Sequence, residues 1–203
     1  RGYVLPLHGD GGRVFRPSQL ATVLPNVHDA DSAGWTPLHS SAVNGNTLLC
    51  TELLRLGADV DPLTDQNQTP LILSVYSGNL DTVKLLLKHG ADAQAFTSFE
   101  KNQAIHIAAD KGYRLILEHL ISNAGASANA KNAVERTPLH LVALNGRVDM
   151  AAFLLRHGAK PQEMDAGGWT PRQMAELNSH RSISELLCQA SITEKAVLVS
   201  PLV

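Results

Sequence analysis

The sequence lacks three features that would place it at once in a familiar functional class. It has no excess of either charge, with 17 basic and 19 acidic residues and a formal net charge of −2, so no nucleic-acid or membrane-surface partner is indicated. It has no apolar run of the ~18 residues that a membrane-spanning helix needs. Aromatic residues make up only 4% of the chain, which is sparse for a globular core but normal for helix pairs packed through Leu, Ala and Val. We therefore expect partners other than nucleic acid or membrane.

The sequence motifs of common catalytic and cofactor sites are missing too. GxSxG, HExxH, CxxC and GxGxxG do not occur. Gly9-Asp10-Gly11-Gly12 is rich in glycine, but no lysine or Ser/Thr follows at the spacing of a phosphate-binding loop. The carboxylates are scattered, and no nucleophile, base and orienting group can be made to converge. We therefore predict a protein that is not an enzyme and that holds no cofactor and no metal.

What the sequence does contain is a tetrapeptide that returns at a nearly fixed spacing. Its copies begin 33, 34, 34 and 33 positions apart, and the third and fifth copies are degraded. A period of this length indicates an array of small stacked units. The copies are Thr36-Pro37-Leu38-His39, Thr69-Pro70-Leu71-Ile72, Gln103-Ala104-Ile105-His106, Thr137-Pro138-Leu139-His140 and Thr170-Pro171-Arg172-Gln173.

Each unit reads as a pair of short helices. Threonine can cap a helix, and proline is tolerated at the first helical position, where its missing amide would be unpaired. A short apolar helix follows, such as residues 139–144, and then a second helix, such as Val148–His157. Helices of this length are below the ~12–15 residues that are marginal in isolation, so the units must stack to be stable. Glycine ends the first helix in four copies, at Gly45, Gly78, Gly112 and Gly146.

A leucine-rich run and a Gly-Ala turn complete the unit, and together these motifs closely resemble the ankyrin repeat over residues 31–190. The turns are Gly57-Ala58, Gly90-Ala91, Gly125-Ala126 and Gly158-Ala159. The resemblance implies an all-α solenoid of stacked helix-turn-helix units with β-turn loops, or fingers, that project from the stack. We expect five repeats, at about 31–63, 64–96, 97–131, 132–164 and 165–190.

The ends of the chain depart from the repeat. The last copy has polar residues where other copies have a leucine, a histidine and an alanine that are expected to be buried: Arg172, Gln173 and Glu176. This favours a solubilising cap as the last repeat. Residues 1–30 are expected to form an N-terminal lid, with a weak hairpin at Asp10-Gly11 and a short helix at residues 18–24. Residues 191–203 are expected to be a tail. Its β-prone segment 196–199 either folds back on the last helix, stays partly disordered or docks on another protein by strand addition.

The tetrapeptide histidines have a structural role in the ankyrin family. The resemblance implies that His39, His106 and His140 hydrogen-bond locally and toward the loop of the next repeat, while Ile72 cannot do so. A metal site is disfavoured because these histidines lie in separate repeats, whereas a metal needs several converging ligands.

The two cysteines, Cys50 and Cys188, fall on second helices at opposite ends of the array. They are too distant to form a disulfide. Unbridged thiols fit a reducing compartment, so we expect an intracellular protein, cytoplasmic or nuclear.

Partner-binding residues follow from the resemblance, because ankyrin repeats use the fingers and the exposed ends of the first helices as a concave surface. We expect Trp35, Val43 and Tyr76 to form one patch, and Leu144, Arg136 and Trp169 another; each tryptophan either contacts a partner or packs on the neighbouring finger. The candidate residues are Trp35, Gln68, Asn102, Arg136 and Trp169 on the fingers, and Val43, Asn44, Tyr76, Ser77, Asp110, Lys111, Leu144 and Asn145 at the helix ends.

The third repeat departs most from the pattern. It gains one residue near Phe96–Phe99 and one at Ala124. Such departures from a regular scaffold often carry function, which makes Phe99 a further candidate. The alternative is that Phe96 and Phe99 fill a widened gap between fingers.

The sequence therefore favours a non-catalytic protein-interaction module that binds a protein or peptide partner as a scaffold, adaptor or inhibitor and is monomeric on its own. Two alternatives stay open. The chain could be the targeting or regulatory domain of a larger enzyme, because it opens with Arg1 rather than methionine, or a structural subunit of a large assembly.

Overall fold

The computed structural model describes residues 27–199, which contain ten helices and no β-strand. The first helices of the five repeats are α2 (Pro37–Val43), α4 (Pro70–Tyr76), α6 (Ala104–Lys111), α8 (Pro138–Leu144) and α10 (Pro171–Leu177). The second helices are α3 (Thr47–Arg55), α5 (Leu80–Lys88), α7 (Arg114–Ala124), α9 (Val148–Arg156) and α11 (Arg181–Val199).

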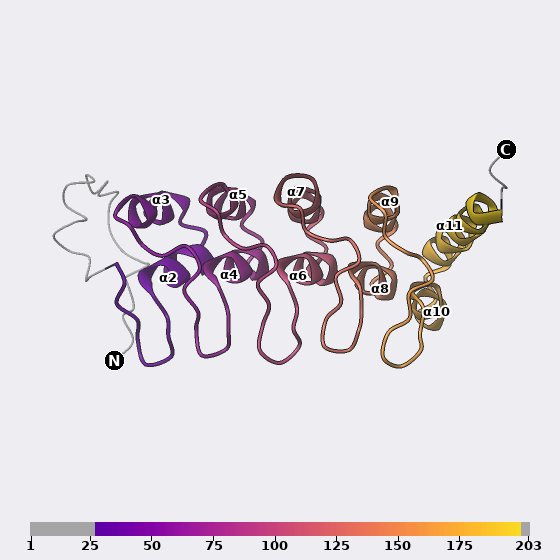
Figure 1. Cartoon of the computed structure of the whole chain (residues 1–203), viewed down its shortest axis with the longest axis horizontal. Coiled ribbons are helices and arrows are strands. Elements are labelled where there is room, and N and C mark those ends of the chain that lie inside the picture. Colours follow the sequence, from indigo (N-terminus) through magenta and orange to yellow (C-terminus); the bar gives the residue numbers. More distant parts are fainter. Residues whose placement is uncertain (1–26, 200–203) are drawn as a thin grey trace.

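The helices form two parallel rows, one of first helices and one of second helices (Figure 1). Each first helix packs against the first helices of the adjacent repeats and against its own second helix. The finger loops all project on the side of the first helices, away from the second row (Figure 1). The predicted all-α repeat solenoid is confirmed.

Threonine and proline begin the first helices as the sequence predicts. Thr36, Thr69, Thr137 and Thr170 are extended N-cap residues, each followed by proline in the first turn. In the degraded third copy, Gln103 takes the cap position and forms a capping box with His106. The cap geometry therefore survives the loss of both threonine and proline.

The tetrapeptide histidines of the first, third and fourth repeats join their repeat to the next, as the resemblance implies. The ring of His39 accepts the Thr36 backbone N–H at Nδ1 (3.0 Å), and its Nε2 lies 3.1 and 3.0 Å from the carbonyl oxygens of Pro62 and Gln68. Because both Nε2 partners are acceptors, Nε2 carries the proton and the ring is neutral. His106 and His140 repeat this pattern toward the following loops.

A glycine joint connects adjacent repeats at the other end of the first helices. Gly146 has φ +67, and a Cβ there would lie 2.6 Å from Nδ1 of His180 in the next repeat. The His180 ring covers this glycine and reaches the Leu144 carbonyl oxygen at 3.0 Å. Glycine is thus required both by the left-handed backbone and by the side chain packed on it. The equivalent pairs are Asn79 over Gly45, Tyr113 over Gly78 and Arg147 over Gly112.

One apolar core runs the length of the stack, because each repeat contributes buried leucines and isoleucines to the space between the two rows. Burial of this shared face is what stabilises helices too short to persist alone. The largest fully buried side chains are Leu38, Leu53, Leu71, Ile72, Leu86, Ile105, Leu117, Leu120, Leu139, Leu154, Ile183 and Leu187.

Residues 191–199 of the expected C-terminal tail are helical and continue α11, while the tail assignment of residues 191–203 stays a prediction. No glycine or proline interrupts the chain between Arg181 and Val199, so nothing stops the helix. Ser191 is buried, and its hydroxyl donates to the Leu187 carbonyl oxygen at 2.8 Å. Strand addition by residues 196–199 is therefore not what this helix offers. The expected hairpin and short helix within residues 1–26 lie outside the described residues.

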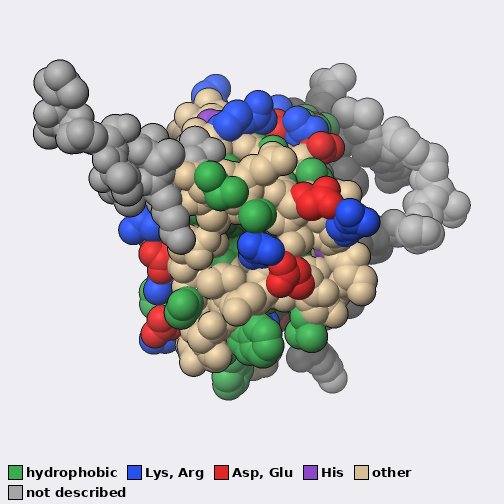
Figure 2. Space-filling view, turned by 90° about the vertical axis from the view of Figure 1, so that its right-hand side faces the viewer, with side chains coloured by type: hydrophobic (Ala, Val, Ile, Leu, Met, Phe, Trp, Pro, Cys, Tyr) green, Lys and Arg blue, Asp and Glu red, His purple; other side chains and the backbone are tan. Residues whose placement is uncertain are grey.

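The C-terminal end of the stack is seen in Figure 2, where acidic and basic side chains alternate and apolar ones lie between them. Arg172 pairs with Glu176 at 2.8 Å and Arg181 with Glu185 at 2.7 Å. Leu177, at the end of α10, is 71% exposed. The polar substitutions noticed in the last copy thus lie on an outward face.

Candidate functional site

The fingers form a continuous, hydrogen-bonded row. Each is a tight turn closed by a backbone bond, such as that from the Asp31 N–H to the Trp35 carbonyl oxygen (2.9 Å). One backbone hydrogen bond joins each finger to the next. The position of each finger is therefore fixed relative to its neighbours. The four joining bonds are Asp65 N–H to Ala33 O (3.0 Å), Ser98 to Gln66 (3.2 Å), Ala133 to Glu100 (2.7 Å) and Ala166 to Val134 (3.0 Å).

The extra residue of the third finger is Phe99. In the second finger the residues bonded to the two neighbours, Asp65 and Gln66, are adjacent, whereas in the third finger Ser98 and Glu100 have Phe99 between them. With both flanking residues held by the neighbouring fingers, Phe99 must bulge outward, and its side chain is 86% exposed. Phe99 therefore does not fill the gap between fingers, which was the alternative interpretation.

A hollow lies beside this bulge, between the second and third fingers. Its volume is about 230 Å³. Three of the sequence-predicted residues, Gln68, Tyr76 and Phe99, come together there. We call it the Tyr76–Phe99 hollow, and its lining residues are Gln66, Gln68, Tyr76, Thr97, Ser98, Phe99 and Glu100.

The Tyr76–Phe99 hollow is acidic. Burial raises the pKa of the half-buried Tyr76 phenol, and the carboxylates of Glu100 and Asp110 raise it further. The Glu100 carboxylate accepts a hydrogen bond from the side-chain amide of Asn102, which in turn accepts one from Asn132 at 2.9 Å. Asn102, predicted as a contact residue, thus also orients Glu100.

Trp35 and Val43 are not among the residues that line the hollow with Tyr76. Both are half-buried, and the Trp35 ring lies 5.9 Å from the His39 ring in a tilted arrangement. The patch of Trp35, Val43 and Tyr76 that the sequence favours stays a prediction. Only the structure groups Tyr76 with the third finger.

Arg136 and Trp169 belong to a structural cluster that sequence reasoning missed. Arg136 Nε lies 3.1 Å from Oδ2 of Asp165, whose side chain is 4% exposed. Asp165 Oδ1 accepts the backbone N–H groups of Gly167 and Trp169 at 2.9 and 3.0 Å. Burial opposes the ionisation of Asp165, but these N–H groups and Arg136 outweigh it and lower the pKa of Asp165.

A sequence signal for this cluster did exist. Asp31 begins the first finger as Asp165 begins the fifth, and its carboxylate likewise accepts the N–H groups of Ala33 and Trp35, each at 2.9 Å. Aspartate at the start of a turn commonly bonds the backbone two residues on. Trp169 remains 45% exposed, so it can still meet a partner.

The predicted polar residues at the ends of the first helices are exposed but partly used within the fold. Asn44 Nδ2 donates to the Ser40 carbonyl oxygen at 2.7 Å, and the Ser77 hydroxyl donates to that of Leu73 at 2.9 Å. Asn145 Nδ2 reaches the Asp110 carboxylate at 3.3 Å. Lys111 is exposed and Leu144 is half-buried. Of the predicted residues at the ends of the first helices, Tyr76 is the one that lines the Tyr76–Phe99 hollow.

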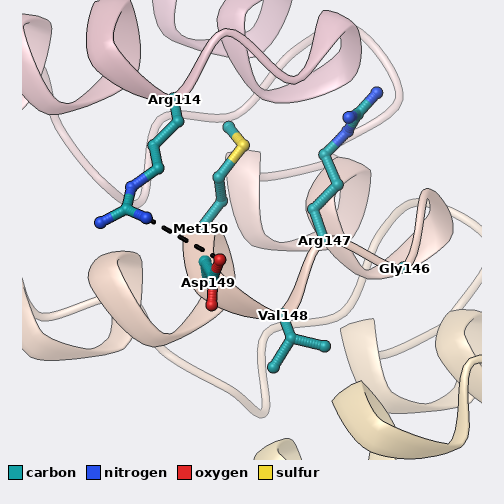
Figure 3. A pocket seen from close by; sticks show the side chains of 6 residues that line it. All are labelled: Arg114, Gly146, Arg147, Val148, Asp149 and Met150. Carbon is teal, nitrogen blue, oxygen red and sulfur yellow. Dashed lines mark ion pairs between the residues drawn. The ribbon is translucent and has the colours of Figure 1, made fainter.

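A second cavity, of about 420 Å³, lies by the N-terminal ends of α7 and α9 (Figure 3). Arg114 faces Asp149, with Nη1 3.8 Å from the carboxylate, whereas the Arg147 guanidinium points away from this pair. Arg147 instead donates to the Asp110 carbonyl oxygen at 3.2 Å. Because the two guanidinium groups diverge, this cavity is not arranged to bind an anion.

Residues 27–199 contain neither a metal site nor a membrane-spanning helix. Among these residues no group of three or more His, Cys, Asp or Glu side chains is placed to hold a metal ion. Nor does this part of the chain contain a helix with the length and apolar character needed to span a bilayer.

The comparisons with known proteins agree with the repeat pattern. A family model described as ankyrin repeats (3 copies) matches residues 17–97 and 105–196. A 26S proteasome non-ATPase regulatory subunit 10 from Dictyostelium discoideum is 37% identical over 79 residues, which are 38% of this chain and 34% of that protein.

Two other relatives are much longer than the matched region. The potassium channel AKT1 of Oryza sativa subsp. indica is 36% identical over 80 residues, which are 39% of this chain but 8% of the channel. The target of rapamycin complex 2 subunit AVO2 of Saccharomyces cerevisiae is 31% identical over 138 residues, 68% of this chain and 25% of that subunit. The chain thus spans about a third or less of the length of these relatives.

Proposed function

Because the chain belongs to the ankyrin-repeat family, we propose that it is a non-catalytic recognition module that holds a segment of a partner protein against its finger row. Ankyrin repeats are protein-interaction modules. The observation that carries the proposal is the Tyr76–Phe99 hollow, where an exposed aromatic side chain and polar groups meet on the finger side of the stack.

The physics of the row favours binding. The fingers are already fixed by backbone bonds to one another, so little conformational entropy is lost when a partner docks. Tyr, Trp and Arg are the side chains most enriched in binding hot spots. The proposed contact residues remain Trp35, Val43, Asn44, Gln68, Tyr76, Ser77, Phe99, Asn102, Asp110, Lys111, Arg136, Leu144, Asn145 and Trp169.

The relatives support an adaptor or scaffold role inside the cell. Two of them are named as subunits, one of the proteasome and one of target of rapamycin complex 2. A second candidate function is a targeting or regulatory region of a larger protein. It is favoured by the potassium channels, in which the matched repeats make up only 8% of the chain.

The proposal is tested by capture from native lysate followed by mass spectrometry. Wild type is compared with the double variant Tyr76→Ala/Phe99→Ala, and with Leu48→Ala/Leu115→Ala as the control. Leu48 and Leu115 are exposed on the second row of helices, away from the fingers.

We expect a partner that is retained by the control and lost from the finger-side variant, with thermal unfolding confirming that both variants fold. Partners retained equally by all three proteins would show that recognition does not use this face.

A further inference from the structure

We propose that the Tyr76–Phe99 hollow accepts a basic side chain, arginine in preference to lysine, from an extended segment of the partner. The inference rests on the proposed function, because it requires a protein segment on the finger side. It goes further by naming the chemistry of the residue that anchors this segment.

The size of the hollow fits a side chain. Its volume of about 230 Å³ is below the roughly 300–1,000 Å³ typical of small-molecule pockets. It is also open to the row of fingers rather than enclosed, since it lies between the second and third of them. A peptide that runs along the fingers can therefore insert one side chain.

The walls suit a cation with an apolar stem. The Phe99 ring is 86% exposed, and its backbone is held on both sides by the bonds of Ser98 and Glu100 to the adjacent fingers. Tyr76 supplies a second aromatic ring. A guanidinium group stacks on aromatic faces more favourably than an ammonium does, because it is planar and more weakly hydrated.

Glu100 supplies the negative charge. Glu100 lines the hollow, and its carboxylate accepts the Asn102 amide, which is itself held by the Asn132 amide. Glu100 forms no ion pair with any residue of the described chain, although Lys101 follows it directly. It therefore retains acceptor capacity for a guanidinium, which binds carboxylates through two parallel hydrogen bonds.

Most other acidic side chains of the fingers already have partners within the fold. Asp31 and Asp165 bond backbone amides of their own turns. Glu135, on the fourth finger, is paired with Lys131 at 3.4 Å. Asp65, beside the hollow residue Gln66, has no ion pair within the described residues either. Asp65 and Glu100 are thus two carboxylates without an ion-pair partner among the described residues, on the two fingers that border the hollow.

The raised pKa of the Tyr76 phenol also reflects nearby negative charge. Apart from burial, the two influences that raise the pKa of Tyr76 are the carboxylates of Glu100 and Asp110. Among the described residues the Asp110 carboxylate accepts the Asn145 amide and has no ion-pair partner. A cation that enters the hollow is therefore attracted by the two carboxylates that act on the Tyr76 phenol.

The test uses a display library of random dodecapeptides selected against the immobilised chain. We expect enriched peptides to contain arginine. For one such peptide the arginine is replaced by lysine, by neutral citrulline or by norleucine, and the dissociation constants are measured by fluorescence polarisation. Citrulline should weaken binding about tenfold or more, and lysine should weaken it less.

Variants of the chain complete a double-mutant cycle. Glu100→Gln should weaken the arginine peptide about tenfold but leave the citrulline peptide nearly unchanged, because the charge pair is then already absent. Glu135→Gln, which removes a carboxylate from the fourth finger, should change neither.

Each alternative outcome has a distinct meaning. Enriched peptides that need Phe99 but carry no basic residue would overturn the basic-side-chain assignment and leave the proposed function standing. Binding that ignores Phe99, Tyr76 and Glu100 alike would overturn both. A selection without any Phe99-dependent binder would also overturn the assignment.

Discussion

Asp61 and Asn129 occupy the same place in their repeats, in the turn after the second helix, but differ in their hydrogen bonding. Asn129 accepts the Lys160 N–H at Oδ1 (2.9 Å), and its amide donates to the Gly158 carbonyl oxygen at 2.8 Å. Asp61 accepts the Asp92 N–H at 2.8 Å, but its buried Oδ1 has no partner. Burial accordingly raises the pKa of Asp61. A carboxylate at this position has no N–H group, so it cannot donate a hydrogen bond as the Asn129 amide does.

At the residue scale we therefore predict that Asp61→Asn stabilises the protein. The new amide can donate as Asn129 does, which should raise the free energy of unfolding by about 1 kcal/mol. The converse change, Asn129→Asp, should lower it by a similar or larger amount. Urea denaturation at neutral pH measures both, and a destabilised Asp61→Asn variant would contradict this account.

At the scale of the element, the joint between repeats depends on side chains that cross it. The Arg147 guanidinium covers Gly112 and donates to the Asp110 carbonyl oxygen at 3.2 Å. Gly90, in the turn after α5, also has a left-handed backbone, but a Cβ there would meet nothing within 4 Å. Substituting each glycine by alanine therefore separates two contributions to the free energy of unfolding. One is the strain of a left-handed alanine, and the other is the loss of packing against Arg147.

We predict that Gly112→Ala destabilises the stack clearly more than Gly90→Ala. Both changes incur the penalty of about 1–2 kcal/mol for a left-handed alanine, but only Gly112→Ala also displaces Arg147 and its hydrogen bond. Thermal and urea unfolding of the two variants give the comparison. Equal losses would show that the guanidinium contributes nothing to the joint.

At the scale of the whole molecule, the three tetrapeptide histidines make the stack sensitive to acid. Burial lowers the pKa of His39, His106 and His140 below the ordinary value of 6.5. The folded state therefore favours the neutral rings, and protonation would place a new N–H against the backbone N–H that Nδ1 accepts. Stability from this source is complete above pH 6.5 and is lost as pH falls from there toward the lowered folded values.

We predict that the urea midpoint stays constant between pH 7 and 8 and falls from about pH 6.5 downward. His140→Gln should make this fall smaller, because Gln173 already fills the same position in the last repeat and accepts the Thr170 N–H at 2.9 Å. The variant will also be less stable at pH 7.5, since the bond to the Trp169 carbonyl oxygen is lost. A midpoint that does not change between pH 7.5 and 5.5 would refute the prediction.

The repeat and the shape of its unit follow directly from local features of the amino-acid sequence. Local features define the unit: a threonine cap, the proline after it, a glycine at the helix end and a leucine run. Each acts within a few residues and recurs in most copies. The histidine bonds were predictable too, because the family resemblance assigns a role to the position of His39. The sequence was less decisive for α11, where an apolar, β-branched segment continued as a helix in the absence of a breaker.

Which side chains meet on the finger side became clear from the folded structure. It grouped Tyr76 with Phe99, showed Phe99 to be the extra finger residue, and placed Arg136 against Asp165. These contacts join residues about one repeat apart, and they depend on the direction of each side chain and on which backbone groups bond between fingers. The period of the sequence fixes the spacing of the repeats but carries no information on these directions, so the contacts between repeats appear only once the units are stacked.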